Sequence, residues 1–379
     1  MTAPLEGLKI LDLSRILAGP FAGQTLADLG ATVIKVEAPG GDDTRTWGPP
    51  FIARDGDRSA AYFYAANRGK RSVVADFGKA EDLALVRNLA AQADVLLENF
   101  KVGGLARFGL DYPALAAANP GLVYCSITGF GQDGPYADRA GYDYLIQGMS
   151  GLMSITGASN GEPQRVGVAI TDLVSGLYSV IGILAALRER DRTGRGQQLD
   201  ISLLDSATAI LANQAMNYFA SGTAPGRLGN IHPNIVPYQV FPVADGEVII
   251  AAGNDAQYRR LCGVLGCPDL AEAPEYATNG DRVRRREALV PLLISATRAW
   301  SRDDLLAALE AVKVPAGPIN SIAQVIEDEQ IKARGMHIRP EGVDGLRSPF
   351  RFSDSTLETS RTAPMPDQHG HAIRDKGFG

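Results

Sequence analysis

An aspartate at the start of an apolar helix is the clearest candidate for chemistry in this sequence. Asp172 precedes the run Leu173–Leu187, whose length and composition are typical of a helix buried in a protein core. A helix N-terminus stabilises an ionised carboxylate, and the small neighbours Ser175 and Gly176 leave room for a substrate. Two interpretations stay open, because such an aspartate serves either as a helix cap or as a nucleophile that is ionised at neutral pH.

Two other segments have the composition of anion sites. The glycine-bearing turn Ala18–Gly23 sits where a strand leads into a helix, and Asn67–Arg71 places three cations before a strand. Each has an ordinary alternative, which is tight packing for the first and a solvated surface turn for the second. The turn lacks the GxGxxG spacing and the chain has no GxxxxGK[ST] motif, so a dehydrogenase or an ATPase is disfavoured.

Other kinds of catalytic site find little support. Residues 148–151 begin like the nucleophile elbow of a serine hydrolase, but Leu152 breaks the GxSxG frame. The four histidines are dispersed, and the three cysteines have neither a disulfide framework nor a zinc-site spacing. We therefore expect no metal site and a reducing compartment.

The composition indicates a globular protein of more than one domain. Its 379 residues exceed the roughly 250 to 300 at which a single core stops growing. The chain has 37 Lys and Arg against 43 Asp and Glu, and the resulting net charge of −6 argues against nucleic-acid binding. The N-terminus lacks a signal-peptide pattern, and Leu173–Leu187 is shorter than the ~20 residues that cross a bilayer. We expect a cytoplasmic protein that does not span a membrane.

Short β-branched runs alternate with amphipathic segments through the N-terminal half. This alternation predicts a doubly wound parallel sheet, in which ligands bind beyond the carboxyl ends of the strands. The expected strands are Leu8–Leu13, Thr32–Glu37, Arg71–Asp76, Asp94–Glu98, Leu122–Thr128 and Gln198–Ser202. The expected ligand-binding loops are Ser14–Pro20, Ala38–Gly41, Asn99–Lys101 and Gly129–Gly131.

A change of composition marks a second domain. Residues 221–226 look like a linker, and the stretch that follows mixes short strands with helices up to about residue 312. The segment Val314–Pro318 then separates this region from a C-terminal stretch that contains little that could fold alone.

Several segments in series resemble the class III CoA-transferases, the CaiB/BaiF family. The resemblance covers nearly the whole chain and does not depend on any one motif. The segments are PLEGLKILDLSRILAGPFAGQTLADLGATVIKVE, NRGKRS, DVLLENF, YCSITGFGQDGPYADRAGYD, SGLMSITG, AITDLVSG, TGRGQQLDISLLD, VPAGPINS and SPFRFS.

This resemblance implies an α/β fold with a Rossmann-like large domain, a smaller α/β domain and an interlocked homodimer. Residues 1–220 and 313–379 would form the large domain, and 221–312 the small one. Asp172 matches the nucleophile in the family's D-x-x-[ST/A]-G segment, and CoA is implied as a substrate with no tightly bound cofactor. The implied CoA contacts are Ile16, Leu17, Ala18, Ala75, Asp76, Phe77, Gly78, Asn99, Phe100, Arg107, Arg139 and Tyr142.

The implied reaction moves CoA from an acyl-CoA donor to a carboxylic acid through an aspartyl anhydride and an aspartyl-CoA thioester. Asp42–Phe51 and Ile235–Gln239 look most like the branch that uses succinyl-CoA and dicarboxylates such as glutarate. Arg45 is a candidate for holding the distal carboxylate, and a surface ion pair with Asp42 or Asp43 is the alternative.

Two other functions are compatible with the same resemblance. An α-methylacyl-CoA racemase shares the fold, but it uses a histidine in a GHD segment as one of two bases, and this chain has Gly141-Tyr142-Asp143 there. Tyrosine, with an ordinary pKa near 10, is a poor base at neutral pH. The other alternative is a CoA-binding protein without chemistry, which the intact Asp172 disfavours.

Overall fold

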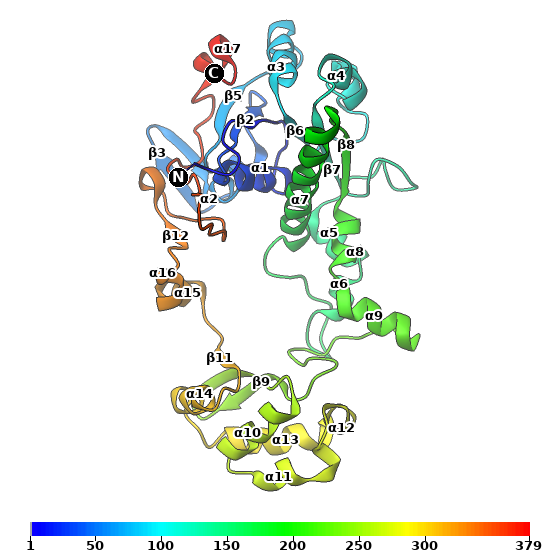
Figure 1. Cartoon of the computed structure of the whole chain (residues 1–379), viewed down its shortest axis with the longest axis vertical. Helices are drawn as coiled ribbons and strands as arrows, with labels where there is room; N and C mark the ends of the chain where they lie inside the picture. The colour runs from blue at the N-terminus through cyan, green and yellow to red at the C-terminus, as the bar shows by residue number, and fades with distance from the viewer. Residues whose placement is uncertain (1) are drawn as a thin grey trace. The chain divides into compact units, whose positions relative to one another are not determined.

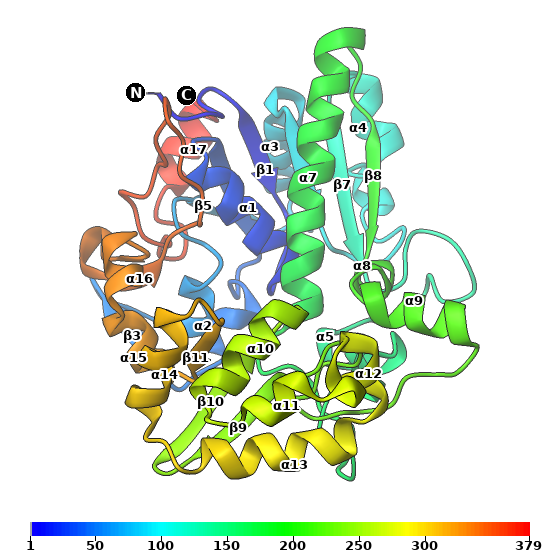
Figure 2. The same cartoon turned by 60° about the horizontal axis from the view of Figure 1, so that its bottom comes forward.

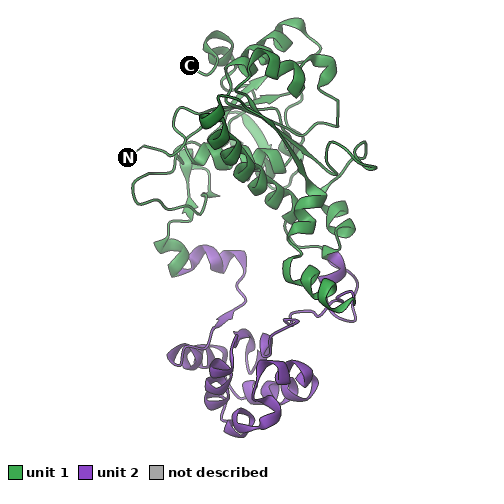
Figure 3. Cartoon of the chain, turned by 45° about the vertical axis from the view of Figure 1, so that its right-hand side comes forward, with its two compact units in different colours: residues 1–152, 165–222, 329–379 green, residues 153–164, 223–328 purple. Residues whose placement is uncertain are grey.

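The computed structural model describes residues 2–379, which form two compact units (Figure 3). The first unit comprises the chain through Leu152, Arg165–Gly222 and Glu329–Gly379, and the second comprises Met153–Gln164 and Thr223–Asp328. The expected linker at 221–226 lies at a boundary between them. The return to the first unit begins at Glu329 instead of residue 313, because the strand β11 (Ala316–Pro318) pairs with a strand of the second unit.

Six parallel strands form the sheet of the first unit, in the order β5-β2-β1-β6-β7-β8 (Figure 1). All six coincide with the strands expected from the sequence, so the prediction of a doubly wound parallel sheet is confirmed. Their bounds are β1 (Lys9–Asp12), β2 (Thr32–Glu37), β5 (Arg71–Val74), β6 (Val95–Glu98), β7 (Val123–Thr128) and β8 (Gln198–Ser202). The strand order reverses between β1 and β6, which is where ligands bind in folds of this kind.

Helices cover both faces of this sheet because successive strand residues point to opposite sides. Helices α1 (Ala18–Asp28) and α7 (Ile170–Thr193) lie on one face of the sheet (Figure 2), and Ile10 belongs to the core cluster that their buried side chains form there. Leu11 packs with the other cluster, under α3 (Ala80–Gln92), α4 (Tyr112–Ala118) and α17 (Gly370–Lys376). Each parallel strand therefore reads as a nearly continuous apolar run.

Shorter elements extend the first unit beyond the sheet. Two helices, not one continuous helix, follow β8, because Ala212 has a φ of 40° at the junction between them. A hairpin that sequence analysis missed follows the second strand. The elements are η1 (Asp43–Thr46), β3 (Phe51–Arg54), β4 (Asp57–Ala60), α2 (Ala61–Tyr64), η2 (Ala106–Phe108), α5 (Asp143–Met149), α8 (Leu203–Ala209), α9 (Ala212–Ser221), α16 (Glu329–Ala333), β12 (His337–Ile338) and β13 (Gly345–Leu346). The short helix α6 (Leu152–Ile155) begins at the last residue of the first segment of this unit and continues in the second unit.

Two of the three cations in Asn67–Arg71 are internal, so neither interpretation of the cluster from the sequence fits them. Arg68 is buried, pairs with Asp28 at 2.5 Å and donates to the carbonyl of Leu346 in the returning segment. Lys70 is fully buried and pairs with Asp12 at 2.7 Å. These cations join parts of the chain that are far apart in sequence, and they are not available to phosphates.

α7 is longer than the sequence suggested, with 24 residues. Its length and a mean hydropathy of 1.8 over an 18-residue window would suffice to cross a membrane, and 44% of that window is buried within the protein. One side of α7 contributes Val180, Ile183 and Leu187 to the core under the sheet, while Ile181 on another side is exposed. The helix is therefore only partly buried.

The second unit has its own core around a three-stranded antiparallel sheet, in the order β11-β10-β9. The mixture of short strands and helices expected in this part of the sequence is present, and Phe241 on β9 and Val248 and Ile250 on β10 bury their side chains against the helices. The elements are β9 (Tyr238–Val243), β10 (Gly246–Ala251), α10 (Asp255–Val264), α11 (Pro268–Glu272), η3 (Pro274–Tyr276), α12 (Asn279–Arg284), α13 (Arg286–Thr297), α14 (Arg302–Ala311) and α15 (Ile322–Glu327).

Candidate active site

A cavity of about 570 Å³ lies beyond the carboxyl ends of β1, β6 and β7, where the strand order reverses. Three of the loops expected from the strand ends line it, those after β1, β6 and β7, and so do Asp172 and Leu203. Of the individually predicted site residues, the structure brings together Ile16, Leu17, Ala18, Asn99, Phe100, Arg107, Arg139, Tyr142 and Asp172 at this one cavity.

A second cavity of about 280 Å³ adjoins the first and is lined in part by the same residues, including Arg15, Phe100 and Arg107. The loop after β2 lines this second cavity, and so do Ala75, Asp76 and Phe77 after β5. The predicted residue Gly78 lines neither cavity, and its N–H donates to the Asp76 carboxylate at 2.9 Å. The two cavities together follow the ends of five neighbouring strands.

Asp172 occupies the third position of α7, within the first helical turn. The N-cap residue of this helix is Ala169, and its side chain accepts no hydrogen bond from the first turn of the helix. The carboxylate of Asp143, at the start of α5, takes that place: its Oδ1 accepts from the N–H of Thr171 at 2.8 Å and from the Thr171 hydroxyl at 2.7 Å. Gln147 donates to the other Asp143 oxygen at 2.7 Å. Asp143 therefore holds the end of α7 on which Asp172 stands.

The ionisation of Asp172 differs from the expectation drawn from its place on the helix. Burial, followed by the charge of Asp143, raises the pKa of Asp172 to about 7. A helix N-terminus favours the anion by only about 0.3–1 kcal/mol, whereas each pKa unit corresponds to about 1.4 kcal/mol. Burial and the neighbouring carboxylate outweigh the helix, so Asp172 is half ionised near neutral pH.

A close helix contact fixes the cavity wall next to Asp172. Gly176, one turn after Asp172, faces the start of α1, and a Cβ at this position would lie 2.7 Å from the carbonyl oxygen of Ala18. Backbone atoms cannot yield as a flexible side chain can. The glycine is therefore what allows the Ile16–Ala18 wall to approach α7.

The charge of the cavity is strongly asymmetric. Among its described lining residues, Arg15, Lys101, Arg107 and Arg139 are cations, and Asp172 is the one carboxylate. Arg15, Arg107 and Arg139 are exposed, and Arg15 pairs with the half-exposed carboxylate of Asp43 at 3.1 Å. Such a lining suits a polyanionic ligand, and Asp172 is the one carboxyl group in it.

The structure contradicts the assignment of Arg45 to substrate. Its guanidinium is buried and holds Glu37 in a bidentate pair, with two N···O distances of 2.7 Å. It also donates to Ser59 and to the carbonyl of Pro364, both at 3.0 Å, and lies 3.6 Å from the centre of the Phe63 ring. It faces neither cavity, and it is not the surface pair with Asp42 or Asp43.

The side chain of Asn99 lines the cavity but is committed to another loop. Its Oδ1 accepts from the N–H of Arg15 at 2.9 Å, and its Nδ2 donates to the Arg15 carbonyl at 2.7 Å. Sequence reasoning did not find this contact, because the two residues are 84 positions apart. Asn99 therefore shapes the loop after β1.

The charge of Asp172 also acts on an aromatic side chain that sequence analysis missed. Burial, followed by the charges of Asp172 and Asp143, raises the pKa of Tyr62 on α2. The Trp47 ring packs edge-on against Tyr62, with 5.4 Å between ring centres. Nothing in the spacing of Tyr62 and Asp172 along the chain signals this electrostatic interaction.

Comparison with known proteins decides the family. Residues 5–370 match CoA-transferase family III. The chain belongs to this family. A succinate–glutarate CoA-transferase of Agrobacterium fabrum is 54% identical over 374 residues, which are 97% of this chain and 94% of the relative. The human succinyl-CoA:glutarate CoA-transferase is 41% identical, and the match covers 97% of this chain and 84% of the human protein.

A solved structure agrees with these relatives. The crystal structure of a CaiB/BaiF family protein from Brucella suis is 59% identical, with a TM-score of 0.91, and the match covers 99% of this chain and 100% of that chain. This family III CoA-transferase acts on CoA thioesters and carboxylic acids, which confirms the class of enzyme expected from the sequence. The racemase alternative loses support, because no histidine is among the described residues that line the cavity.

Proposed function

We propose that this CoA-transferase moves CoA from succinyl-CoA or a similar donor to a dicarboxylate such as glutarate, with Asp172 as the covalent nucleophile. The observation that carries the proposal is the single carboxylate in a cavity whose other charged lining residues are four cations. The names of the two relatives described above support the choice of donor and acceptor.

The two cavities form the proposed CoA site. Arg15 and Arg107 line both of them, and guanidinium groups bind phosphates through two parallel hydrogen bonds. Phe77 and Phe100, whose ring centres are 6.3 Å apart, offer flat apolar surfaces in the second cavity. We assign the nucleotide end of CoA to the second cavity and the thioester end to the first, beside Asp172.

The proposed reaction has four steps, each of which makes or breaks a bond at the Asp172 carboxyl group. It needs no net proton transfer and no redox change. Its oxygen attacks the thioester carbon of the donor, the C–S bond breaks, and a mixed anhydride and CoA thiolate form. The thiolate attacks the Asp172 carbonyl, which releases the donor acid and leaves an aspartyl-CoA thioester. The acceptor carboxylate attacks this thioester and restores the thiolate and an anhydride. The thiolate then takes the new acyl group and frees Asp172.

A test of this function uses the purified protein with succinyl-CoA and glutarate, followed by mass spectrometry of the products. Asp172→Ala should retain the fold and lose all but a few per cent of the turnover. Asp191→Ala is the matched control, because Asp191 lies exposed near the other end of α7. Substantial activity in Asp172→Ala, or CoA binding without turnover over a broad panel of acids, would reject the proposal.

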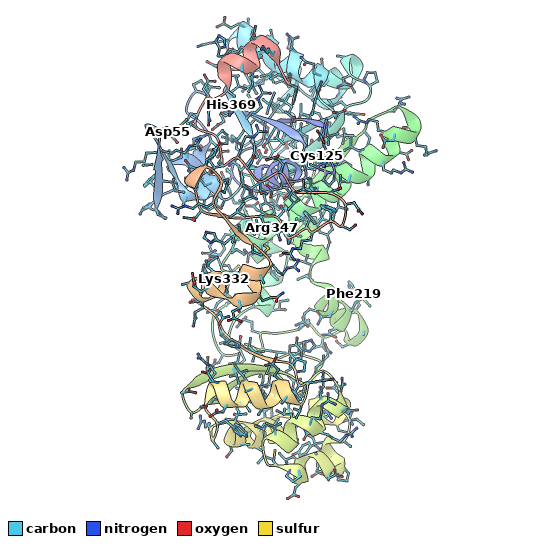
Figure 4. The ribbon with its side chains drawn as sticks, turned by 60° about the vertical axis from the view of Figure 1, so that its left-hand side comes forward. Asp55, Cys125, Phe219, Lys332, Arg347 and His369 are labelled. Carbon is cyan, nitrogen blue, oxygen red and sulfur yellow. The ribbon has the colours of Figure 1, made fainter. Side chains whose placement is uncertain are left out.

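We further propose that two copies form an interlocked homodimer. Large apolar side chains are exposed on α7 and α9, with Ile181 at 61% and Phe219 at 71% exposure. Figure 4 labels Phe219 on α9. Leu177, Tyr178 and Met216 on the same two helices are exposed as well, and patches of this kind mark protein interfaces. Interlocked chains cannot separate without unfolding, so dissociation should coincide with loss of secondary structure. A folded monomer at nanomolar concentration by light scattering would contradict this.

The cytoplasmic location expected from the sequence stays a proposal. Its support is that α7, the one candidate span among the described residues, contributes Val180, Ile183 and Leu187 to the core beneath the sheet. Cell fractionation of the natural host tests it. Recovery in the membrane fraction after a salt wash would contradict it.

A further inference from the structure

The backbone of the loop after β1 is held almost entirely by side chains from other parts of the chain. Ser14 donates its N–H to Asp12 at 2.9 Å, and its carbonyl accepts from Nζ of Lys35 at 2.9 Å. Arg15 exchanges two hydrogen bonds with Asn99. The N–H of Ile16 points to Oδ1 of Asp42 at 3.4 Å, the longest contact of the set. Consecutive peptide groups of this loop are thus fixed from several sides.

Ile16 has a backbone conformation that needs such support. Its φ is 71°, in the left-handed region, which is unfavourable for a β-branched residue. Conformations of this kind persist only where the surrounding structure imposes them. Glycine at this position would adopt the same φ without strain.

Lys35 and Asp42 form the buried part of that support. Nζ of Lys35 lies 2.8 Å from Oδ2 of Asp42, and both side chains are fully buried. Asp42 is itself held by Thr44, whose N–H and hydroxyl donate to Oδ1 at 3.0 and 2.7 Å. Because Lys35 binds the carbonyl of Ser14 and Asp42 faces the N–H of Ile16, the ion pair holds the two peptide groups that precede the Cα of the strained residue.

The strained loop is part of the proposed CoA site. Ile16, Leu17 and Ala18 line the same cavity as Asp172. The carbonyl of Ala18 meets α7 at Gly176, one turn after Asp172. A change in φ at Ile16 would therefore move the cavity wall relative to the nucleophile. Neither Lys35 nor Asp42 lines this first cavity, although both contribute to the wall of the second.

We propose that Lys35 and Asp42 are positioning residues, which hold Ile16 in the left-handed conformation and thereby fix the Ile16–Ala18 wall of the CoA site. This inference rests on the proposed CoA site, and it adds two residues that act without touching the reacting atoms. Buried ion pairs are often no more stabilising than apolar residues of the same volume. A role in fixing one backbone conformation accounts for a pair at this place.

The test is a set of variants whose binding of CoA is measured by calorimetry, which needs no turnover. Asp42→Asn keeps the shape of the side chain and removes its charge. It is introduced into the wild type, into Ile16→Ala and into Ile16→Gly. Alanine removes the isoleucine side chain but keeps the strain, whereas glycine removes both. Asp55→Asn, in the exposed turn of the β3–β4 hairpin, is the matched control (Figure 4).

Asp42→Asn should weaken CoA binding about tenfold in the wild type and in Ile16→Ala, and less than about threefold in Ile16→Gly. The control should bind CoA as the wild type does. If Asp42→Asn does not fold by circular dichroism, Thr44→Val takes its place, because it removes one hydrogen bond to Asp42. Equal weakening in all three backgrounds, or none in the wild type, overturns the inference. Failure of the wild type to bind CoA would reject the proposed function instead.

Discussion

The carboxylate of Asp143 caps helix α7 at Thr171, the residue that precedes Asp172. Asp143 accepts two hydrogen bonds from Thr171, at 2.8 and 2.7 Å, and so caps α7 directly beside Asp172. Its charge adds to burial in raising the pKa of Asp172 to about 7. A carboxylate with a raised pKa is a stronger nucleophile once ionised, and its acyl derivatives still react with a thiolate. The pair thus links the fold of α7 to the reactivity proposed for Asp172.

Replacing Asp143 by asparagine should shift the acid limb of the pH profile of kcat/KM to lower pH. Loss of the negative charge favours the ionised form of Asp172, while the asparagine carbonyl can still accept from Thr171. The profile is measured with succinyl-CoA and glutarate between pH 5 and 9. Asp138→Asn, an exposed position in the preceding loop, is the control. An unchanged acid limb in Asp143→Asn would contradict the electrostatic role of Asp143.

Replacing Asp172 by asparagine should raise the midpoint of thermal unfolding at pH 8. The folded pKa of about 7 lies above the ordinary 3.8, so the folded state binds the proton more tightly. The part of the wild-type stability that comes from this proton is therefore fully present below about pH 4, and it is lost as the pH rises through 7. The gain from Asp172→Asn should reach at most about 4 kcal/mol above pH 7 and vanish toward pH 4. A constant gain across this range would show that Asp172 does not titrate as described.

Two glycines of α7 should respond oppositely to alanine. Gly176→Ala places a methyl group 2.7 Å from the Ala18 carbonyl oxygen, and this clash should cost about 1–3 kcal/mol and impair CoA binding. Gly182→Ala meets only the end of the Leu199 side chain, at 3.4 Å, and should be neutral or slightly stabilising. Urea unfolding and CoA calorimetry measure both. The account of the helix contact fails if the two variants behave alike.

Arg45→Met should destabilise the protein without changing its choice of acid. The change leaves Glu37 buried without its bidentate partner, at a cost of about 3–5 kcal/mol. The ratio of KM values for glutarate and a monocarboxylate should stay that of the wild type. A rise in KM confined to dicarboxylates would restore Arg45 as a substrate residue.

The sequence predicts the sheet and the place of the site because both follow from short-range patterns. Six apolar runs define the parallel strands, and loops at their ends, such as Asn99–Lys101, line the cavities. Pairings over long separations could not be predicted in this way. Arg45 reaches the carbonyl of Pro364, 319 positions away, and the pKa of Asp172 depends on Asp143, in another helix. Spacing along the chain carries no signal for such contacts, which packing alone creates.

Capture of the covalent intermediate tests the central claim most directly. The wild type and Asp172→Ala are incubated with succinyl-CoA alone, quenched in acid and digested, and the peptides are analysed by mass spectrometry. We predict a wild-type adduct of one CoA less one water on Asp172, which hydroxylamine removes, and no adduct in Asp172→Ala. A hydroxylamine-sensitive adduct on another residue, or no adduct while the wild type turns over, would contradict the role of Asp172.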